Sequence, residues 1–287
     1  MNSLYFAQYL ANVGAITPQE TQGIFRDCVS TEPGLAVVAL SEGVVSASKL
    51  AELAPFEKDA FADLAVKEGV LFTSQVEKLR NIHPAEGLKL AQTLLDQGKM
   101  DFIQLGKHIA DYDSRETSPV KDAVRRLAGD GFSAELDTYA DFTELFMRSF
   151  MRFMNAPAVV SIGEKLMEEG GTHIVSQRLL GALSFVSGIY AEDAVLLEIA
   201  KRYSHEEMEE VDELAEDSIA EFLNVVNGLF VVDLGKRDLD IDLDTPHVEK
   251  NKRPMGSHQL EMWVETGFGF FALVLAADEF AFKGKIF

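Results

Sequence analysis

The chain has 287 residues, 47% of them hydrophobic, and a formal net charge of −21. This length and composition predict folded globular domains, with room for two of ordinary size. The acidic balance argues against nucleic acid and anionic membrane surfaces as partners, because both attract basic patches. A single cysteine, Cys28, excludes an internal disulfide and is typical of a reducing compartment. The N-terminus lacks a basic segment, and the longest apolar run, Phe268–Ala277, is too short for a membrane-spanning helix, so we expect a cytoplasmic protein.

Four stretches of the N-terminal half share one pattern: apolar residues at helical spacing, a glycine, one or two apolar residues, and a residue that can cap a helix. The glycines are Gly14, Gly43, Gly69 and Gly98, and the capping residues are Thr17, Ser46, Thr73 and Asp101. Glycine can end a helix in the left-handed conformation, and the capping side chain can begin the next helix. The glycine spacings of 29, 26 and 29 residues suit helix-turn-helix repeats. We therefore predict an all-helical repeat domain over residues 1–112.

Residues 113–133 are predicted to form a linker, because polar residues ending in Pro119 and a Gly-Asp-Gly sequence at 129–131 favour irregular structure. A second domain then covers residues 134–287. It begins with a predicted helix, Tyr139–Met154, which ends before Pro157.

The rest of the second domain mixes strands and helices. The strand segments are His173–Val186, divided at Gly181 and closed by Gly188, and then Asp238–Asp244, Leu260–Val264 and Phe268–Ala277. The helical segments are Ala191–Tyr203 and a long acidic helix from His205 to Val226, closed by Gly228. Strands mixed with non-alternating helices predict an α+β sandwich.

The aspartates of the segment 238–244 allow a metal interpretation. Asp238, Asp240 and Asp242 match the first ligand positions of a calcium loop, and Glu249 falls at the twelfth. However, the sixth position is Leu243, where such a loop needs glycine for its sharp turn. A half-buried strand with solvated aspartates is the favoured interpretation. The sequence also lacks CxxC, P-loop and GxSxG motifs, so metal, thiol and serine-nucleophile chemistry have no motif here.

One face of the long acidic helix carries the most informative residues of the chain. At about 100° per residue, Asp217, Glu221 and Asn224 fall within an arc of roughly 60°, opposite the apolar stripe. An amide beside a carboxylate can bind a partner or position a water molecule. Both side chains can equally be solvated, as most acidic helix faces are.

These residues resemble the signature of the CheC/CheX chemotaxis phosphatases. In that family an Asp/Ser-x3-Glu-x2-Asn helix is followed by a proline. Here Asp217, Glu221 and Asn224 are followed, after 21 intervening residues, by Pro246. The resemblance covers about residues 135–287. It implies an α/β sandwich in which long helices pack on a mostly antiparallel sheet.

The resemblance also implies a reaction. Members of the family hydrolyse the aspartyl-phosphate of CheY-like receiver domains of response regulators. Asn224 would orient the attacking water, Glu221 would pair with a receiver lysine, and Asp217 and Pro246 would contact the partner. The Mg²⁺ ion would belong to the receiver, so no cofactor of the chain's own is expected. A homodimer is possible, as in the CheX branch.

The CheC branch often carries a second Glu-x-x-Asn motif on its first helix. In this chain Glu144 is followed three residues later by Met147, which predicts one active site per chain. The main alternative is a CheX-like adaptor that binds a receiver or motility component without hydrolysis, with the helical half as sensor.

The N-terminal half resembles the small helical domain at the N-terminus of type II secretion and type IV pilus ATPases. Some members of that family bind cyclic di-GMP through Arg-Leu-Gly-type motifs. The nearest match here, Gln104-Leu105-Gly106, lacks the arginine. We therefore expect a helical interaction module whose partner the sequence does not identify.

Overall fold

The structure is a computed structural model that describes residues 5–82, 86–129, 135–161, 165, 167 and 171–283. It divides into two compact units, Met1–Ser118 and Pro119–Phe287. This division falls inside the segment predicted as a linker, but Pro119–Ala128 within that segment forms a helix of the second unit. The predicted start of the second domain, at Ala134, lies outside the described residues.

All regular elements described in the first unit are helical, which confirms the prediction for this half. They are α1 (Phe6–Asn12), α2 (Pro18–Ser30), α3 (Leu35–Ser41), α4 (Ala47–Leu53), η1 (Lys58–Ala60), α5 (Phe61–Lys67), α6 (Thr73–Arg80), α7 (Glu86–Asp96) and α8 (Phe102–Asp113).

The repeat junctions of this unit form as the sequence predicts at three places of four. The repeat glycines have the positive φ angles of left-handed residues: Gly14 +72°, Gly43 +67°, Gly69 +67° and Gly98 +64°. Ser46 and Asp101 accept hydrogen bonds from backbone N–H groups three residues later, at 3.2 and 2.8 Å. The Thr17 backbone N–H donates to Glu20 Oε2 at 3.2 Å. These contacts satisfy N–H groups that a helix start otherwise leaves without partners.

The predicted cap at Thr73 is wrong. Helix α6 begins at Thr73 itself, and Phe72 occupies the cap position before it. The backbone N–H of Phe72 donates to Gln75 Oε1 at 2.8 Å, so the glutamine side chain closes this helix start. By pattern alone, an exposed phenylalanine at this position is not distinguishable from a core residue.

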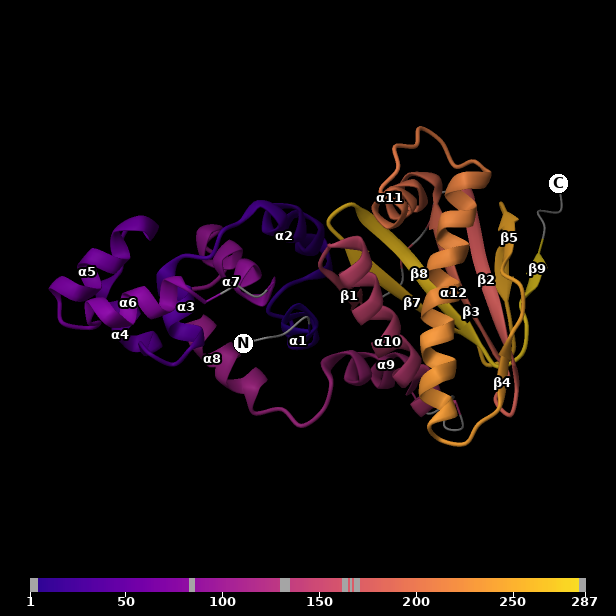
Figure 1. The fold of residues 1–287 in the computed structure, drawn as a ribbon, viewed down its shortest axis with the longest axis horizontal. Helices are drawn as coiled ribbons and strands as arrows, with labels where there is room; N and C mark the ends of the chain where they lie inside the picture. The colour runs from indigo at the N-terminus through magenta and orange to yellow at the C-terminus, as the bar shows by residue number, and fades with distance from the viewer. Residues whose placement is uncertain are drawn as a thin grey trace. The chain divides into compact units, whose positions relative to one another are not determined.

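The second unit is built around one antiparallel sheet (Figure 1). Its strand order is β1-β7-β8-β3-β2-β4, and β5 also pairs with β2. The strands are β1 (Ala158–Ser161), β2 (Thr172–Gly181), β3 (Phe185–Glu192), β4 (Ile241–Leu243), β5 (His247–Lys250), β7 (Leu260–Thr266) and β8 (Gly269–Ala276). A separate ribbon pairs β6 (Arg253–Met255) with β9 (Ala281–Lys283).

The long helices α10 (Leu136–Met154) and α12 (Glu213–Gly235) cross one face of this sheet (Figure 1). The shorter α11 (Asp193–Ser204) packs against both, and α9 (Pro119–Ala128) packs on α10. Phenylalanines fill the layer between helices and sheet: the ring centroids of Phe146 and Phe222 lie 5.7 Å apart, and those of Phe150 and Phe271 lie 5.0 Å apart. The architecture confirms the α+β prediction.

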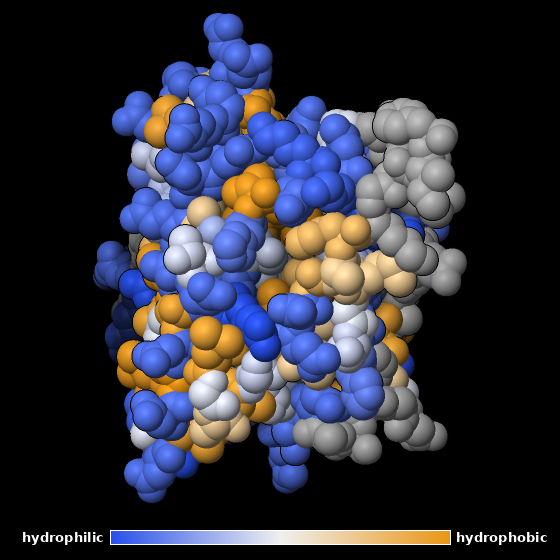
Figure 2. Space-filling view, turned by 90° about the vertical axis from the view of Figure 1, so that its right-hand side faces the viewer, coloured by the Kyte–Doolittle hydropathy of each residue, from blue (hydrophilic) through white to orange (hydrophobic). Residues whose placement is uncertain are grey.

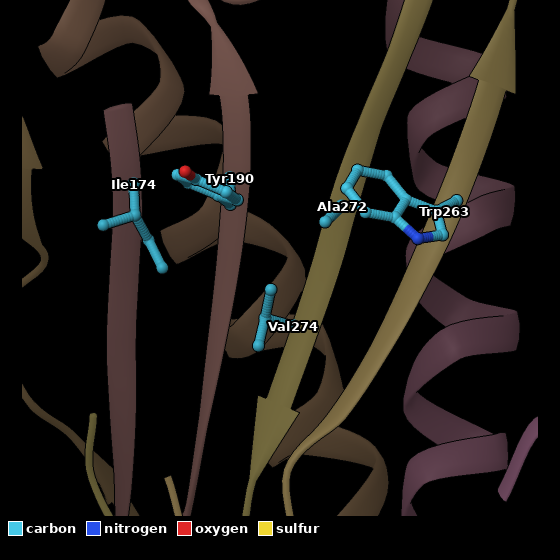
Figure 3. Close-up of a cluster of buried hydrophobic side chains, with 5 residues drawn as sticks. All are labelled: Ile174, Tyr190, Trp263, Ala272 and Val274. Atoms are coloured by element: carbon cyan, nitrogen blue, oxygen red, sulfur yellow. The ribbon is translucent and has the colours of Figure 1, made fainter. Parts of the chain in front are cut away.

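A second apolar layer covers the opposite face of the sheet. It consists of Ile174, Tyr190, Trp263, Ala272 and Val274 (Figure 3). Phe280 and Phe282 pack against these residues. Successive residues of a strand point to opposite faces. The residues at odd positions in β2 therefore face the helices, and Gln177 is one of them.

Helix α12 is shifted relative to its prediction. It begins at Glu213, where the Asp212 side chain accepts from the Ala215 N–H at 3.1 Å, rather than at His205. It also continues through Gly228, the predicted end, to Gly235. The reason is tertiary: Phe230 and Leu234 continue the buried stripe, and their packing outweighs the weak helix propensity of glycine.

By length and composition alone, α12 is the one described helix that could cross a membrane. One side of it packs within the unit, where Phe222, Leu223, Val226 and Phe230 are buried, while Leu229 and Val232 are exposed.

Two further strand predictions need correction. Gly188 does not end a strand but lies inside β3, paired with Ser176 and Val274. A Cβ at this position would lie 3.0 Å from the Phe280 ring and 3.1 Å from Ile174, so a larger residue would require these side chains to move by a few tenths of an ångström. In the aspartate-rich segment only Ile241–Leu243 is a strand, because Asp238 takes a left-handed turn conformation (φ +59°).

Candidate active site

The structure places Asp217, Glu221 and Asn224 on the exposed side of α12. Phe222 and Val226, one to two residues away, are fully buried and anchor the helix against the sheet. The helical periodicity therefore predicted the exposed stripe correctly. The Glu221 carboxylate has no hydrogen-bond or ion-pair partner among the described residues.

Pro246 lies in the segment that joins β4 to β5. These two short strands pair with opposite halves of β2, so they form one edge strand with an interruption at residues 244–246. Proline suits such an interruption because it has no backbone N–H to contribute to a ladder. The surface on the side of β5 and β9 is mostly hydrophilic, with apolar groups between (Figure 2).

Gln177 of β2 connects the helix to this edge segment. Its side chain is only 1% exposed. Its Nε2 donates to Asn224 Oδ1 at 2.7 Å and to the Asp244 backbone carbonyl at 2.8 Å. Asn224 and the segment that contains Pro246, far apart in the sequence, are thus attached to one buried side chain.

The hydrogen-bond network continues beneath the helix. Asn227 Nδ2 donates to Gln177 Oε1 at 2.8 Å, and Ser187 Oγ donates to Asn227 Oδ1 at 3.0 Å. Both Asn227 and Ser187 are fully buried. Sequence analysis missed these residues, although an asparagine three positions after Asn224 inside an apolar helix was a usable signal, because buried amides need partners.

Aromatic side chains lie beside the candidate site. The Tyr203 ring contacts the Phe222 ring, with centroids 5.6 Å apart, and Phe153 lies 5.8 Å from Tyr203 and is 39% exposed. Burial, followed by the negative charge of Glu221, raises the pKa of the Tyr203 hydroxyl. Glu221 therefore stands at the margin of a partly apolar surface.

Helix α10 offers no second site of this kind. Met147 is fully buried, and Glu144 lies 3.4 Å from Lys121, which also binds Asp141 at 2.6 Å. Lys121, Asp141 and Glu144 line a groove of about 800 Å³ between α10 and α12. Its exposed arginines, Arg148 and Arg152, give it a more basic character than the acidic chain as a whole.

The calcium interpretation finds no support in the arrangement of the aspartates. In the part of the chain that the structure describes, no three His, Cys, Asp or Glu residues are grouped as metal ligands. Asp242 lies in β4 and Glu249 in β5, and both strands pair along β2.

The described arrangement offers a partner the carboxylates of Asp217 and Glu221 and the amide of Asn224 on one side of a helix. An amide both donates and accepts hydrogen bonds and carries no charge, so it can approach an anionic group without repulsion. The amide of Asn224 is not a nucleophile, so its part can only be to hold and orient other groups. The chemistry that fits is the orientation of a water molecule or of a partner's polar groups.

Residues 174–260 match the family model described as chemotaxis phosphatase CheX, and this segment includes Glu221, Asn224, Gln177 and Pro246. Solved structures are also similar. The chemotaxis protein CheX from Vibrio vulnificus is 21% identical, with 47% of this chain and 98% of that chain covered and a TM-score of 0.39. A CheC-like superfamily protein from Shewanella sp. PV-4 is 20% identical, with 50% and 98% covered and a TM-score of 0.40.

A structure described as the CheX–CheY–BeF3–Mg²⁺ complex from Borrelia burgdorferi is 18% identical, with 50% of this chain and 96% of that chain covered and a TM-score of 0.38. No curated protein matches the chain.

Proposed function

We propose that this chain is a phosphatase for the aspartyl-phosphate of a CheY-like receiver domain, because residues 174–260 match the family model of chemotaxis phosphatase CheX. The observation that carries the proposal is the pair Glu221 and Asn224, exposed one turn apart on α12 within the matched segment. The partner is a response regulator, and the Mg²⁺ ion is part of the receiver's site. The reaction takes place in the cytoplasm.

In the proposed reaction Asn224 enters the receiver's site and hydrogen-bonds a water molecule. The water oxygen attacks the phosphorus atom, the bond from phosphorus to the aspartyl oxygen breaks, and phosphate and a free aspartate carboxylate result. The chain forms no covalent intermediate. Its contribution is positioning, which converts a loosely placed water into one held in line with the breaking bond.

Glu221 has a binding role in this proposal. Its carboxylate, without a partner among the described residues, pairs with a lysine of the receiver and so sets the position of α12 in the complex. Asp217, one turn earlier, and Pro246, in the neighbouring edge segment, contact the receiver around this pair.

The test is phosphate release from a magnesium-loaded receiver labelled on its aspartate. Wild-type chain is expected to accelerate release, and Asn224→Ala to lose this acceleration by at least about 100-fold, because misplaced reacting groups lose rates of this order. Asn81→Ala, at an exposed asparagine of the first unit, is the matched control and should behave as wild type. Glu221→Ala should mainly weaken binding.

Two results would contradict the proposal. If wild type accelerates release from no receiver of its own genome, the chain is not a phosphatase. If it binds the phosphorylated receiver with unchanged phosphate lifetime, the adaptor alternative is correct.

A further inference from the structure

We propose that Gln177 is a positioning residue that sets the orientation of the Asn224 amide before any partner binds. This inference rests on the proposed function, since it concerns the residue that would orient the water. It begins from one contact: Gln177 Nε2 donates to Asn224 Oδ1 at 2.7 Å from a position that is 1% exposed.

The direction of every amide in the network follows from one backbone group. The Asp244 carbonyl can only accept, so the end of Gln177 that faces it, at 2.8 Å, must be the Nε2 donor. Gln177 Oε1 must then accept from Asn227 Nδ2, and Asn227 Oδ1 accepts from Ser187 Oγ. Turning any of these amides would place two donors or two acceptors against each other.

The consequence reaches Asn224. Because Gln177 presents a donor, Asn224 must turn its Oδ1 inward. Its Nδ2 has no acceptor among the described residues, and Oδ1 retains a second lone pair. Both N–H groups and this lone pair are thus available to a water molecule or phosphoryl oxygen, in a fixed direction.

Burial makes the network rigid. Gln177, Asn227 and Ser187 are 1%, 0% and 0% exposed, so no solvent replaces a broken hydrogen bond at these positions. The same Gln177 amide holds the Asp244 carbonyl, two residues before Pro246. Gln177 therefore fixes both the direction of the Asn224 amide and the distance between α12 and the edge segment. Less conformational entropy is then lost when a partner binds.

The first test replaces the donor without changing the shape. Gln177→Glu puts a carboxylate oxygen opposite Asn224 Oδ1 and the Asp244 carbonyl, so repulsion should turn or displace the Asn224 amide. We expect kcat for phosphate release to fall by about 10- to 100-fold while KM for the receiver stays within about twofold. The control is Thr143→Val, which should retain kcat. It removes a buried hydroxyl of α10 that contacts Met262, a residue of the sheet to which Gln177 also belongs.

A double-variant comparison separates positioning from general damage. If Gln177 acts through Asn224, Gln177→Glu should have no further effect on rate in an Asn224→Ala background. If Gln177→Glu lowers the rate by the same factor in Asn224→Ala as in wild type, its effect does not act through Asn224, and the inference is overturned.

The second test needs no variant to fold. In the NMR spectrum of the full chain, both Nε2 protons of Gln177 should exchange with water at least about tenfold more slowly than those of the exposed Gln19, because both are hydrogen-bonded and buried. Exchange as fast as in Gln19 would overturn the inference, as would a wild-type kcat in Gln177→Glu. If wild type and Asn224→Ala do not differ in phosphate release, the proposed function fails instead, and the exchange measurement still decides whether Gln177 holds the amide.

Discussion

Glu221 and Asn224 lie three residues apart, yet their surroundings differ. Asn224 is hydrogen-bonded from below by a buried glutamine, whereas Glu221 extends without a partner among the described residues. An anchored amide suits a task that needs a fixed direction, such as orienting water. An unattached carboxylate suits an ion pair that forms only in a complex.

This difference predicts a kinetic separation at Glu221. Glu221→Gln should raise KM for the receiver by about tenfold at low ionic strength, with kcat changed by less than about threefold, because it removes a charge rather than a water-orienting group. The difference in KM between wild type and Glu221→Gln should become smaller as salt is added, since salt screens exposed ion pairs. Steady-state phosphate release at two salt concentrations measures both effects.

The control is Glu213→Gln, which removes the same charge from the exposed first turn of α12. An equal effect there would mean that only overall charge matters. A second readout is the titration of Tyr203, because burial and then the charge of Glu221 raise its pKa. In Glu221→Gln this pKa should move down toward its usual value.

At the scale of elements, two glycines of the second unit differ in whether their position can accommodate a side chain. Gly228 lies inside α12, and apart from the adjoining helix backbone nothing lies within 4 Å of the position that a Cβ would take there, so a side chain at this position would meet no clash. Gly181 has φ +125°, and a Cβ there would lie 2.4 Å from the Asp240 carbonyl oxygen. The first glycine is replaceable and the second is not.

Urea unfolding tests this contrast. Gly228→Ala should increase the free energy of unfolding of the second unit by about 0.5–1 kcal/mol, because alanine has the higher helix propensity. Gly181→Ala should decrease it by at least about 1–3 kcal/mol through strain and displacement of the Asp240 backbone. Stabilisation by Gly181→Ala, or a loss on Gly228→Ala, would contradict the described backbone.

At the scale of the whole molecule, each unit has its own buried core. We therefore expect two unfolding transitions, and a substitution in one unit should shift only one of them. Glu20 offers a test in the first unit. Hydrogen bonds from Lys99, and then from the Thr17 hydroxyl and backbone N–H, lower the pKa of Glu20 to about 2.

A lowered carboxyl pKa stabilises the folded state above the unfolded pKa of about 4.5, and the contribution disappears as pH falls toward 2. The Glu20 side chain is partly exposed to solvent, so screening limits the effect of Glu20→Gln to less than about 1 kcal/mol at pH 7. Thermal unfolding at neutral pH and at a pH near 2 should show a lowered first-unit transition only at neutral pH. A shift of both transitions would contradict independent units.

The sequence by itself determined the features that depend on neighbours along the chain. The helical repeats follow from glycines that accept positive φ and from caps such as Ser46, and the exposed position of Asn224 follows from helical periodicity. Only the tertiary structure decided where packing opposes local preference. It extended α12 through Gly228, placed Gly188 inside a strand, and joined Gln177 to Asn224 across 47 residues. Such contacts depend on sheet register and burial, which no local pattern encodes.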